Sequence, residues 1–175
     1  MAFGRMADMK NLFPRRACLL PLMFLSLLLV STAGAQQPTI FLVRHAEKAA
    51  AGGNDMNLSA AGRARAKSLA TVLKDAGISA IYTSEFKRTK QTAEPLAKAL
   101  KVTPEVIRAD DQTTLITRLK GSSGSVLVVG HSDTVPELVK TLGITTTIKI
   151  GDNDYDNLFV VALGPEPRLI RLHYR

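Results

Sequence analysis

Two histidines and two arginines follow predicted β-strands of this chain. Arg44 and His45 directly follow the apolar run at 39–43, Arg88 begins a helix just after the run at 78–82, and His131 follows Gly130 after the run at 125–129. In open α/β sheets, ligands bind beyond the carboxyl ends of the strands. A lone histidine there is more often a structural hydrogen-bonding group than a catalyst, and a lone arginine is usually a surface charge. Three such strand ends at one edge of a sheet together predict a functional site.

The elements that would position these side chains alternate between strand and helix. Short apolar and β-rich runs predict strands at 39–43, 78–82, 103–107 and 125–129, and a closing hairpin at 158–163 and 168–172. Helical patterns predict helices from the N-cap Ser59 to about residue 73, and at 87–100, 113–119 and 136–142. This alternation predicts an α/β fold, a three-layer α/β/α sandwich with a mostly parallel central sheet.

The N-terminal segment has the layout of a secretory signal peptide. A basic stretch ending in Arg15-Arg16 precedes an apolar run at 17–30, and the small residues Ala33-Gly34-Ala35 follow. The apolar run is shorter than the roughly 20 residues that span a bilayer, so a retained membrane anchor is the weaker alternative. We expect a signal peptide at 1–35, cleaved after about Ala35, and one periplasmic or secreted domain at 36–175. The strongly apolar run favours the general secretory route over twin-arginine export.

Composition narrows the possible chemistry. The formal net charge is +8, of which residues 1–35 carry +3, and aromatic residues make up only 5% of the chain. A remaining charge of +5 with few aromatics argues against a nucleic-acid partner. Cys18 is the only cysteine, and it would leave with the signal peptide. The mature domain would then have no disulfide, no cysteine–zinc site and no cysteine nucleophile.

Four segments form a recognisable set of motifs: Val43–Glu47, Leu58–Gly62, Tyr82–Ala93 and Val129–Ser132. The first resembles the Arg-His-Gly/Ala signature of the histidine phosphatase superfamily, which includes phosphoglycerate mutases, acid phosphatases and phosphohistidine phosphatases. The second and third resemble its Leu-Ser-x-x-Gly and Ser-x-x-x-Arg-x-x-x-Thr-Ala elements, and the fourth resembles its second-histidine motif. The four motifs occur in the order of the family and extend over nearly all of the predicted mature chain. The chain therefore resembles the small members of this superfamily, and this resemblance implies their phosphoglycerate mutase-like fold.

The resemblance implies a catalytic role for each of the four side chains. His45 would attack phosphorus and become a phosphohistidine, which water then hydrolyses. Arg44 and Arg88 would bind the phosphoryl oxygens and offset charge in the transition state. His131 would donate a further hydrogen bond to the same oxygens. No metal or other cofactor is expected, because the arginines take the electrostatic role that magnesium has in kinases.

The proton donor to the leaving group is left open by the motifs. A departing alkoxide needs a proton, so a carboxyl group should stand opposite the nucleophile. Asp133 is favoured because it shares a loop with His131, although it could equally serve only to cap the next helix. Asp110, Asp111 and Glu47 are the other candidates for this general acid.

Two clues to the substrate disagree. A phosphoramidate such as phosphohistidine needs less acid assistance, and this short chain resembles the small phosphohistidine phosphatases. An exported protein, however, would rarely meet cytoplasmic phosphohistidine. We therefore expect a small phosphomonoester first, with a phosphorylated envelope glycan as one conceivable substrate, and a phosphoramidate second.

Three other functions remain as alternatives. The first is a non-catalytic phosphate- or anion-binding member of the same fold, and the second is a phosphoglycerate mutase-type phosphotransferase. The third is a metal-binding protein that would use His45, His131 and His173.

Overall fold

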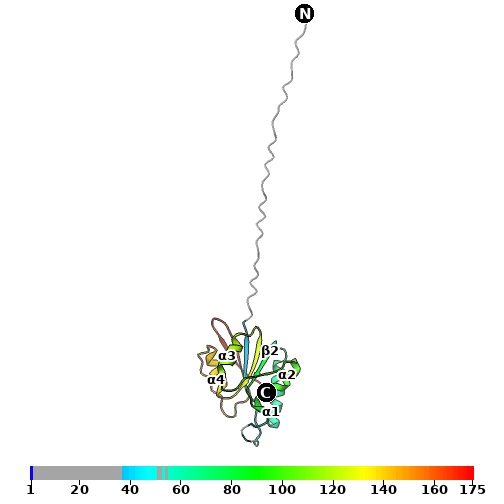
Figure 1. Ribbon diagram of the computed structural model, residues 1–175, viewed down its shortest axis with the longest axis vertical. Helices are drawn as coiled ribbons and strands as arrows, with labels where there is room; N and C mark the ends of the chain where they lie inside the picture. Colours follow the sequence, from blue (N-terminus) through cyan, green and yellow to red (C-terminus); the bar gives the residue numbers. More distant parts are fainter. Residues whose placement is uncertain (2–36, 51–52, 54) are drawn as a thin grey trace. The chain divides into compact units, whose positions relative to one another are not determined.

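The computed structural model describes Met1, residues 37–50, Gly53 and residues 55–175. Apart from Met1, the predicted signal peptide and its cleavage site lie outside these residues (Figure 1). The described part of the predicted mature domain begins at residue 37. None of the helices in this described part is both long enough and apolar enough to cross a membrane.

Six strands form one sheet in the spatial order β3-β2-β4-β1-β5-β6. Their bounds are β1 (Thr39–Arg44), β2 (Ile78–Thr83), β3 (Glu105–Val106), β4 (Ser125–Gly130), β5 (Asn157–Ala162) and β6 (Arg168–His173). The first four strands are parallel to one another, whereas β5 is antiparallel to β1 and β6 is antiparallel to β5. The sheet is therefore mixed, and the prediction of a mostly parallel sheet needs this correction.

The antiparallel pairing of β5 and β6 follows from the path of the segment before β5. This segment returns to the edge where β1 ends, since the carbonyls of Gly151 and Asp152 both accept hydrogen bonds from Arg44. Strand β5 starts from that edge and must run opposite to β1, and the hairpin then adds β6.

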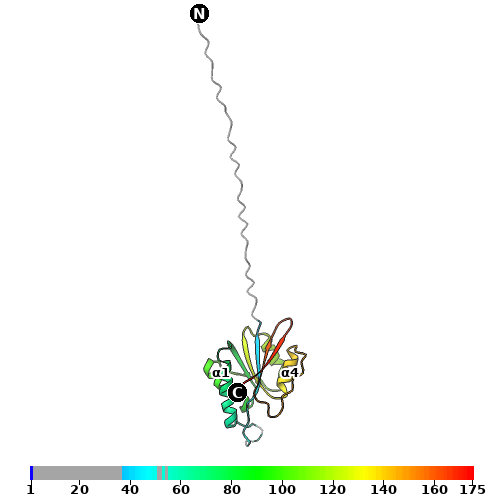
Figure 2. The ribbon, with the colours of Figure 1, turned by 180° about the vertical axis from the view of Figure 1, so that it is seen from behind.

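Two pairs of helices cover the two faces of the sheet (Figures 1 and 2). The helices are α1 (Ala60–Leu73), α2 (Lys87–Leu100), α3 (Gln112–Lys120) and α4 (Thr134–Thr141). Leu69 of α1 and Leu96 of α2 belong to the apolar core on one face, and Leu119 of α3 and Leu138 of α4 belong to the core on the other. The predicted three-layer α/β/α sandwich is confirmed.

The predicted elements are present, with small shifts at their ends. Helix α2 has the predicted bounds, and Ser59 caps α1 by accepting a hydrogen bond from the backbone N–H of Gly62. Helix α4 begins two residues before the predicted start at Pro136. A proline in the first turn removes only an N–H that has no partner within the helix, so it need not mark the first residue.

The register of the central strands determines which loop residues become neighbours. Arg44 of β1 pairs with Gly130 of β4, and Thr83 of β2 pairs with Val129. The backbone N–H of His45 continues the first ladder by donating to the Gly130 carbonyl at 2.9 Å. The residues that follow these three strand ends therefore meet at one edge of the sheet.

Candidate active site

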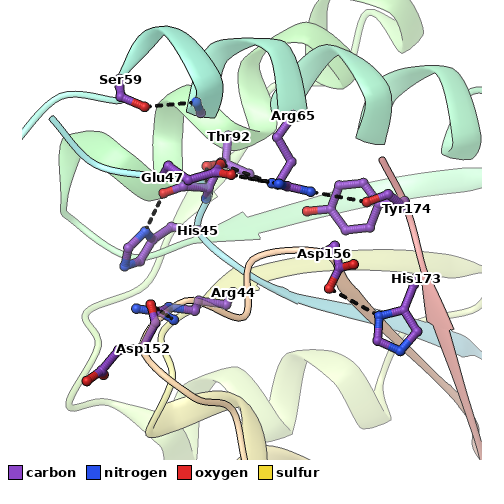
Figure 3. A network of polar contacts seen from close by, with 12 residues as sticks. Arg44, His45, Glu47, Ser59, Arg65, Thr92, Asp152, Asp156, His173 and Tyr174 are labelled. Carbon is purple, nitrogen blue, oxygen red and sulfur yellow. Dashed lines mark hydrogen bonds and ion pairs between the residues drawn. The ribbon is translucent and has the colours of Figure 1, made fainter.

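The imidazole of His45 is held in one orientation by its own loop. The side chain is 5% exposed, and its Nδ1 lies 2.8 Å from the carbonyl oxygen of Ala46 (Figure 3). A carbonyl oxygen can only accept, so Nδ1 must carry the hydrogen. The other ring nitrogen, Nε2, then has its lone pair free whenever the ring is neutral.

The surroundings of His45 keep that ring neutral. The pKa of His45 is lowered from 6.5 to about 4, and burial is the largest cause. The hydrogen bond to Ala46 opposes this effect only in part, whereas His131, Arg88 and Arg44 add to it, because a positive charge on the ring would be repelled. At neutral pH, His45 is therefore an uncharged base with an available nitrogen.

Helix α2 anchors the loop that fixes this tautomer. The backbone N–H of Ala46 donates to Oγ1 of Thr92 at 3.0 Å, and that hydroxyl donates to the carbonyl of Arg88 at 2.7 Å. Thr92 is fully buried. The threonine of the third motif thus holds the residue whose carbonyl orients His45.

A second anchor comes from α1. Arg65 donates from Nε to both carboxylate oxygens of Glu47, at 2.8 and 3.0 Å, and from Nη1 to the carbonyl of Tyr174 at 3.2 Å (Figure 3). Burial tends to raise the pKa of Glu47, but the hydrogen bonds and charge of Arg65 outweigh it and lower that pKa. Glu47 is therefore an ionised carboxylate that ties the loop to α1 and to the end of the chain.

The glycine of the second motif has a steric explanation. Gly62 lies in the first turn of α1, against the backbone of Glu47. A Cβ at this position would lie within 2.2 Å of the Glu47 carbonyl oxygen. Only glycine allows α1 to approach the loop after His45 this closely.

Arg44 is oriented by neutral groups. Its Nη1 donates to the carbonyls of Gly151 and Asp152 at 2.7 and 2.9 Å, and its guanidinium lies 4.3 Å from the ring centroid of Tyr155. Its Nε is buried and has no hydrogen-bond partner among the residues that the structure describes. Nε and Nη2 form the edge with which arginine binds an oxyanion through two parallel hydrogen bonds. Arg44 is thus held through Nη1, while its buried Nε remains available to a bound oxyanion.

Arg88 and His131 complete the group of side chains that the sequence predicts to meet. The ring centroids of His45 and His131 are 5.4 Å apart, and the guanidinium of Arg88 lies 4.2 Å from the ring centroid of Phe86. The positive charges of Arg88 and Arg44 lower the pKa of both histidines. The structure therefore brings Arg44, His45, Arg88 and His131 together at one edge of the sheet.

The candidate proton donors are all engaged in other contacts. Asp133 is exposed and caps α4, with Oδ1 accepting from the Thr134 N–H at 2.8 Å. Asp111 caps α3, and the exposed Asp110 pairs with Arg108 at 2.8 Å. Glu47, the fourth candidate, is held by Arg65 as described above. The helix-capping role considered for Asp133 is observed, and its charge also raises the pKa of His131.

Two residues near the histidines were not predicted as parts of the site. Ser84 places its Oγ 3.0 Å from Nε2 of His131, and the ring of Tyr155 lies 6.3 Å from that of His45. Ser84 stands in the third motif, where its position could have signalled a role. Tyr155 lies in an acidic turn, and its sequence neighbourhood carries no such signal.

The alternative of a metal site on three histidines finds no support in the geometry. Among the described residues, no group of three or more His, Cys, Asp or Glu side chains is arranged to hold a metal ion. Nδ1 of His173 instead contacts Oδ1 of Asp156 at 3.1 Å, at the end of β6 (Figure 3).

Comparisons with known proteins agree with this fold and these motifs. The family model of the histidine phosphatase superfamily, branch 1, matches residues 40–112, which include the first three motifs. This part of the chain therefore resembles the histidine phosphatase superfamily, and the solved structures described next share the α/β/α fold. A search of curated proteins gives no significant match.

Several solved structures share the fold. The protein histidine phosphatase SixA, complexed with tungstate, has a TM-score of 0.65 and 22% identity, over 77% of this chain and 96% of that one. A putative phosphohistidine phosphatase SixA from Agrobacterium tumefaciens has a TM-score of 0.59 and 24% identity, over 77% and 97% of the two chains. A mycobacterial glucosyl-3-phosphoglycerate phosphatase with inorganic phosphate has a TM-score of 0.62 and 16% identity, over 75% and 95%.

The close approach at Gly62 gives a first prediction. Gly62→Ala should lower the free energy of unfolding by about 1–3 kcal/mol, because the new methyl group must displace the Glu47 carbonyl or shift α1. Denaturant unfolding measures this loss. Gly164→Ala is the matched control, since a Cβ there meets no atom within 4 Å, and it should change stability by less than about 0.5 kcal/mol. Equal stabilities for the two variants would show that the contact imposes no constraint.

Proposed function

We propose that this chain is an exported phosphatase that hydrolyses phosphomonoesters through a covalent phosphohistidine on His45. The observation that carries the proposal is the free Nε2 of His45. This nitrogen belongs to a buried ring held neutral next to Arg44 and Arg88. An uncharged nucleophile beside fixed positive charges suits attack on an anionic phosphoryl group.

The proposed reaction has two displacements at phosphorus. In the first, the Nε2 lone pair forms a bond to phosphorus, and the bond from phosphorus to the leaving oxygen breaks. In the second, water attacks the phosphohistidine, the P–N bond breaks and phosphate leaves. Arg44 and Arg88 stabilise the charge on the transferring group in both steps, so we propose that no metal ion is required.

Phosphomonoesters are the proposed substrate class, with phosphoramidates as the second choice. The printed names of the structural relatives include both kinds of activity, a protein histidine phosphatase and a sugar-acid phosphatase. The expected signal peptide favours the first class, because an exported protein would rarely meet cytoplasmic phosphohistidine.

The export proposal rests on the sequence of the first 35 residues. Their basic, apolar and small segments occur in the order of a signal peptide, with cleavage expected before Gln36. We propose a periplasmic or secreted location for the mature domain.

A phosphatase assay tests the nucleophile. The purified protein should hydrolyse 4-nitrophenyl phosphate in the presence of EDTA, and His45→Ala should lower kcat/KM by roughly 10³-fold or more, because the covalent route is lost. His173→Ala is the matched control, because this histidine contacts Asp156 instead, and it should retain the activity of the unmodified protein.

Two results would contradict this mechanism. Equal rates for His45→Ala and the unmodified protein would exclude His45 as nucleophile, and loss of activity with EDTA would exclude a metal-independent site. Rapid quenching with ³²P-labelled substrate should trap a phosphoenzyme that is labile in acid and stable in alkali, as a phosphohistidine is. An inactive protein that nevertheless binds phosphate would favour the anion-binding alternative.

Cell fractionation tests export. In a Gram-negative host, the full chain should appear in the periplasm, and N-terminal sequencing should begin at Gln36. A variant with Leu25→Arg and Leu28→Arg interrupts the apolar run and should remain in the cytoplasm at full length. Cytoplasmic accumulation of the unmodified chain would contradict export, and an uncleaved chain in the membrane fraction would favour the anchor.

A further inference from the structure

The positive charge of the folded domain is concentrated on one of its two helical layers. Helices α1 and α2 pack against each other on one face of the sheet (Figures 1 and 2). Seven exposed lysines and arginines belong to these helices and their C-terminal ends. Only three carboxylates, those of Asp55, Asp75 and Glu94, pair with them, which leaves a net charge of +4. All other side chains of residues 37–175 together contribute only +1.

Helical periodicity brings these cations to one side of each helix. On α1 and its C-cap, spacings of four and seven residues place three of them on one side: Arg63, Lys67 and Lys74. On α2, three more share a side: Lys87, Lys90 and Lys98. The seventh is Lys101, the C-cap of α2. The side chain of Arg63 donates to the Leu58 carbonyl, and the Leu58 N–H donates to Gln91 of α2, both at 2.8 Å. The basic side of α1 therefore adjoins α2, and the seven cations form one basic face.

A groove at the basic face combines lysines with apolar side chains. It lies between α2 and the segment that leads into β3, and its volume of about 580 Å³ is typical of ligand-binding clefts. Lys90, Lys98 and Lys101 line it, and so do four apolar residues: Ala97, Val102, Pro104 and Val106. Val106 belongs to the edge strand β3 and is 49% exposed. The groove therefore offers both positive charge and apolar surface to a partner.

Lys101 has a backbone conformation that favours a different residue. Its φ of 56° is the one positive φ outside glycine among the described residues. Left-handed residues at the end of a helix are usually glycine, because a Cβ makes this conformation less favourable. Neither Lys101 nor Lys90 forms an ion pair with a described residue, whereas Lys98 pairs with Glu94. Two ammonium groups of the groove are therefore not neutralised within the described domain, and one of them stands where glycine would fold more easily.

We infer that the basic face and its groove dock on the surface of an anionic lipid bilayer. The cations extend over two helices, which is more than one small anion can contact. Each lysine or arginine near an anionic membrane strengthens binding by roughly fivefold. Val106 and the other apolar residues of the groove enter the boundary between headgroups and acyl chains, whereas a soluble polyanion has no apolar surface to match them. The inference does not depend on the phosphatase function proposed above.

Vesicle sedimentation measures this docking. The full chain should bind vesicles of phosphatidylglycerol and phosphatidylcholine, and the affinity should fall as NaCl is raised from about 50 to about 500 mM, because salt screens the charges. Lys90→Gln, Lys98→Gln and Lys101→Gln combined should lower this affinity by about 100-fold, since three cations are lost. All variants have the same N-terminal segment, so the differences between them report on the folded domain. An unchanged affinity in this triple variant would overturn the inference.

Three cations of the opposite layer provide the matched control. Arg118→Gln, Lys120→Gln and Lys140→Gln combined remove the same charge from exposed positions of α3 and α4. This variant should keep its affinity for the same vesicles within about threefold, because these residues lie on the other face of the sheet and salt screens their charges. An equal loss in both triple variants would show a response to net charge without a defined face, and it would overturn the inference.

Hydrogen exchange locates the contact. On vesicles that contain phosphatidylglycerol, the backbone amides of residues 98–106 should exchange more slowly than in solution, because the bilayer covers them. The amides of residues 134–149, on the other layer, should exchange at the same rate as in solution. Attachment through the N-terminal segment alone would leave both segments unchanged, and this result would overturn the inference.

Val106→Ser distinguishes a bilayer from a soluble polyanion. Loss of this apolar side chain should weaken binding to the vesicles by about threefold to fivefold, because less apolar surface is buried. Binding to heparin, a soluble polyanion, should not respond to the change. Tight binding to heparin, together with vesicle binding that does not respond to Val106→Ser, would assign the basic face to a soluble polyanion and overturn the inference.

Lys101→Gly separates binding from folding at the end of α2. Glycine adopts a positive φ without strain, so this variant should raise the midpoint of thermal unfolding. It should also weaken binding to the phosphatidylglycerol vesicles by about fivefold, because one cation of the groove is lost. Unchanged binding, at any unfolding midpoint, would show that Lys101 serves the helix end alone and would overturn this part of the inference.

Discussion

The hydrogen bond from Nδ1 of His45 to the Ala46 carbonyl fixes which nitrogen of the ring is free, and much of the surrounding structure supports this contact. Thr92 holds the N–H of Ala46, and Arg65 holds the carboxylate of the next residue, Glu47. Gly62 allows α1 to lie against the same backbone. The motifs around residues 58–62 and 82–93 thus stabilise one short loop, although they are distant from it in sequence.

The second constraint is electrostatic. Arg44 is only 7% exposed, yet its Nη1 is held by neutral backbone carbonyls, and Tyr155 covers its guanidinium. Burying a charge in this way is costly unless an opposite charge compensates it. The same positive charge contributes to the low pKa of His45. An anion at this edge would compensate the buried charge of Arg44, which is the physical basis of the proposed phosphate site.

The sequence was most informative where local signals were strong. The bounds of α2, the cap at Ser59 and the buried strands β1 and β4 follow from periodicity and apolar runs, and the motifs selected the side chains that meet at the sheet edge. The antiparallel β5 could not be predicted, because its direction depends on where an irregular segment returns.

The contacts of Arg44 with Gly151, Asp152 and Tyr155 escaped prediction for the same reason, since more than 100 residues separate the partners. Asp133 shows a different limit of sequence reasoning. Its position in the chain suited both a catalytic and a capping role, and only the geometry reveals the bond to Thr134.

The protonation of His45 in the free protein tests the central claim most directly. With ¹⁵N-labelled histidine, NMR at neutral pH should find Nδ1 protonated and Nε2 unprotonated, because Ala46 accepts from Nδ1. The ring should stay neutral as the pH falls through 6.5 and take up its second proton only towards about pH 4, because burial and the nearby positive charges oppose it. A proton on Nε2 at neutral pH, or titration near 6.5, would contradict the account.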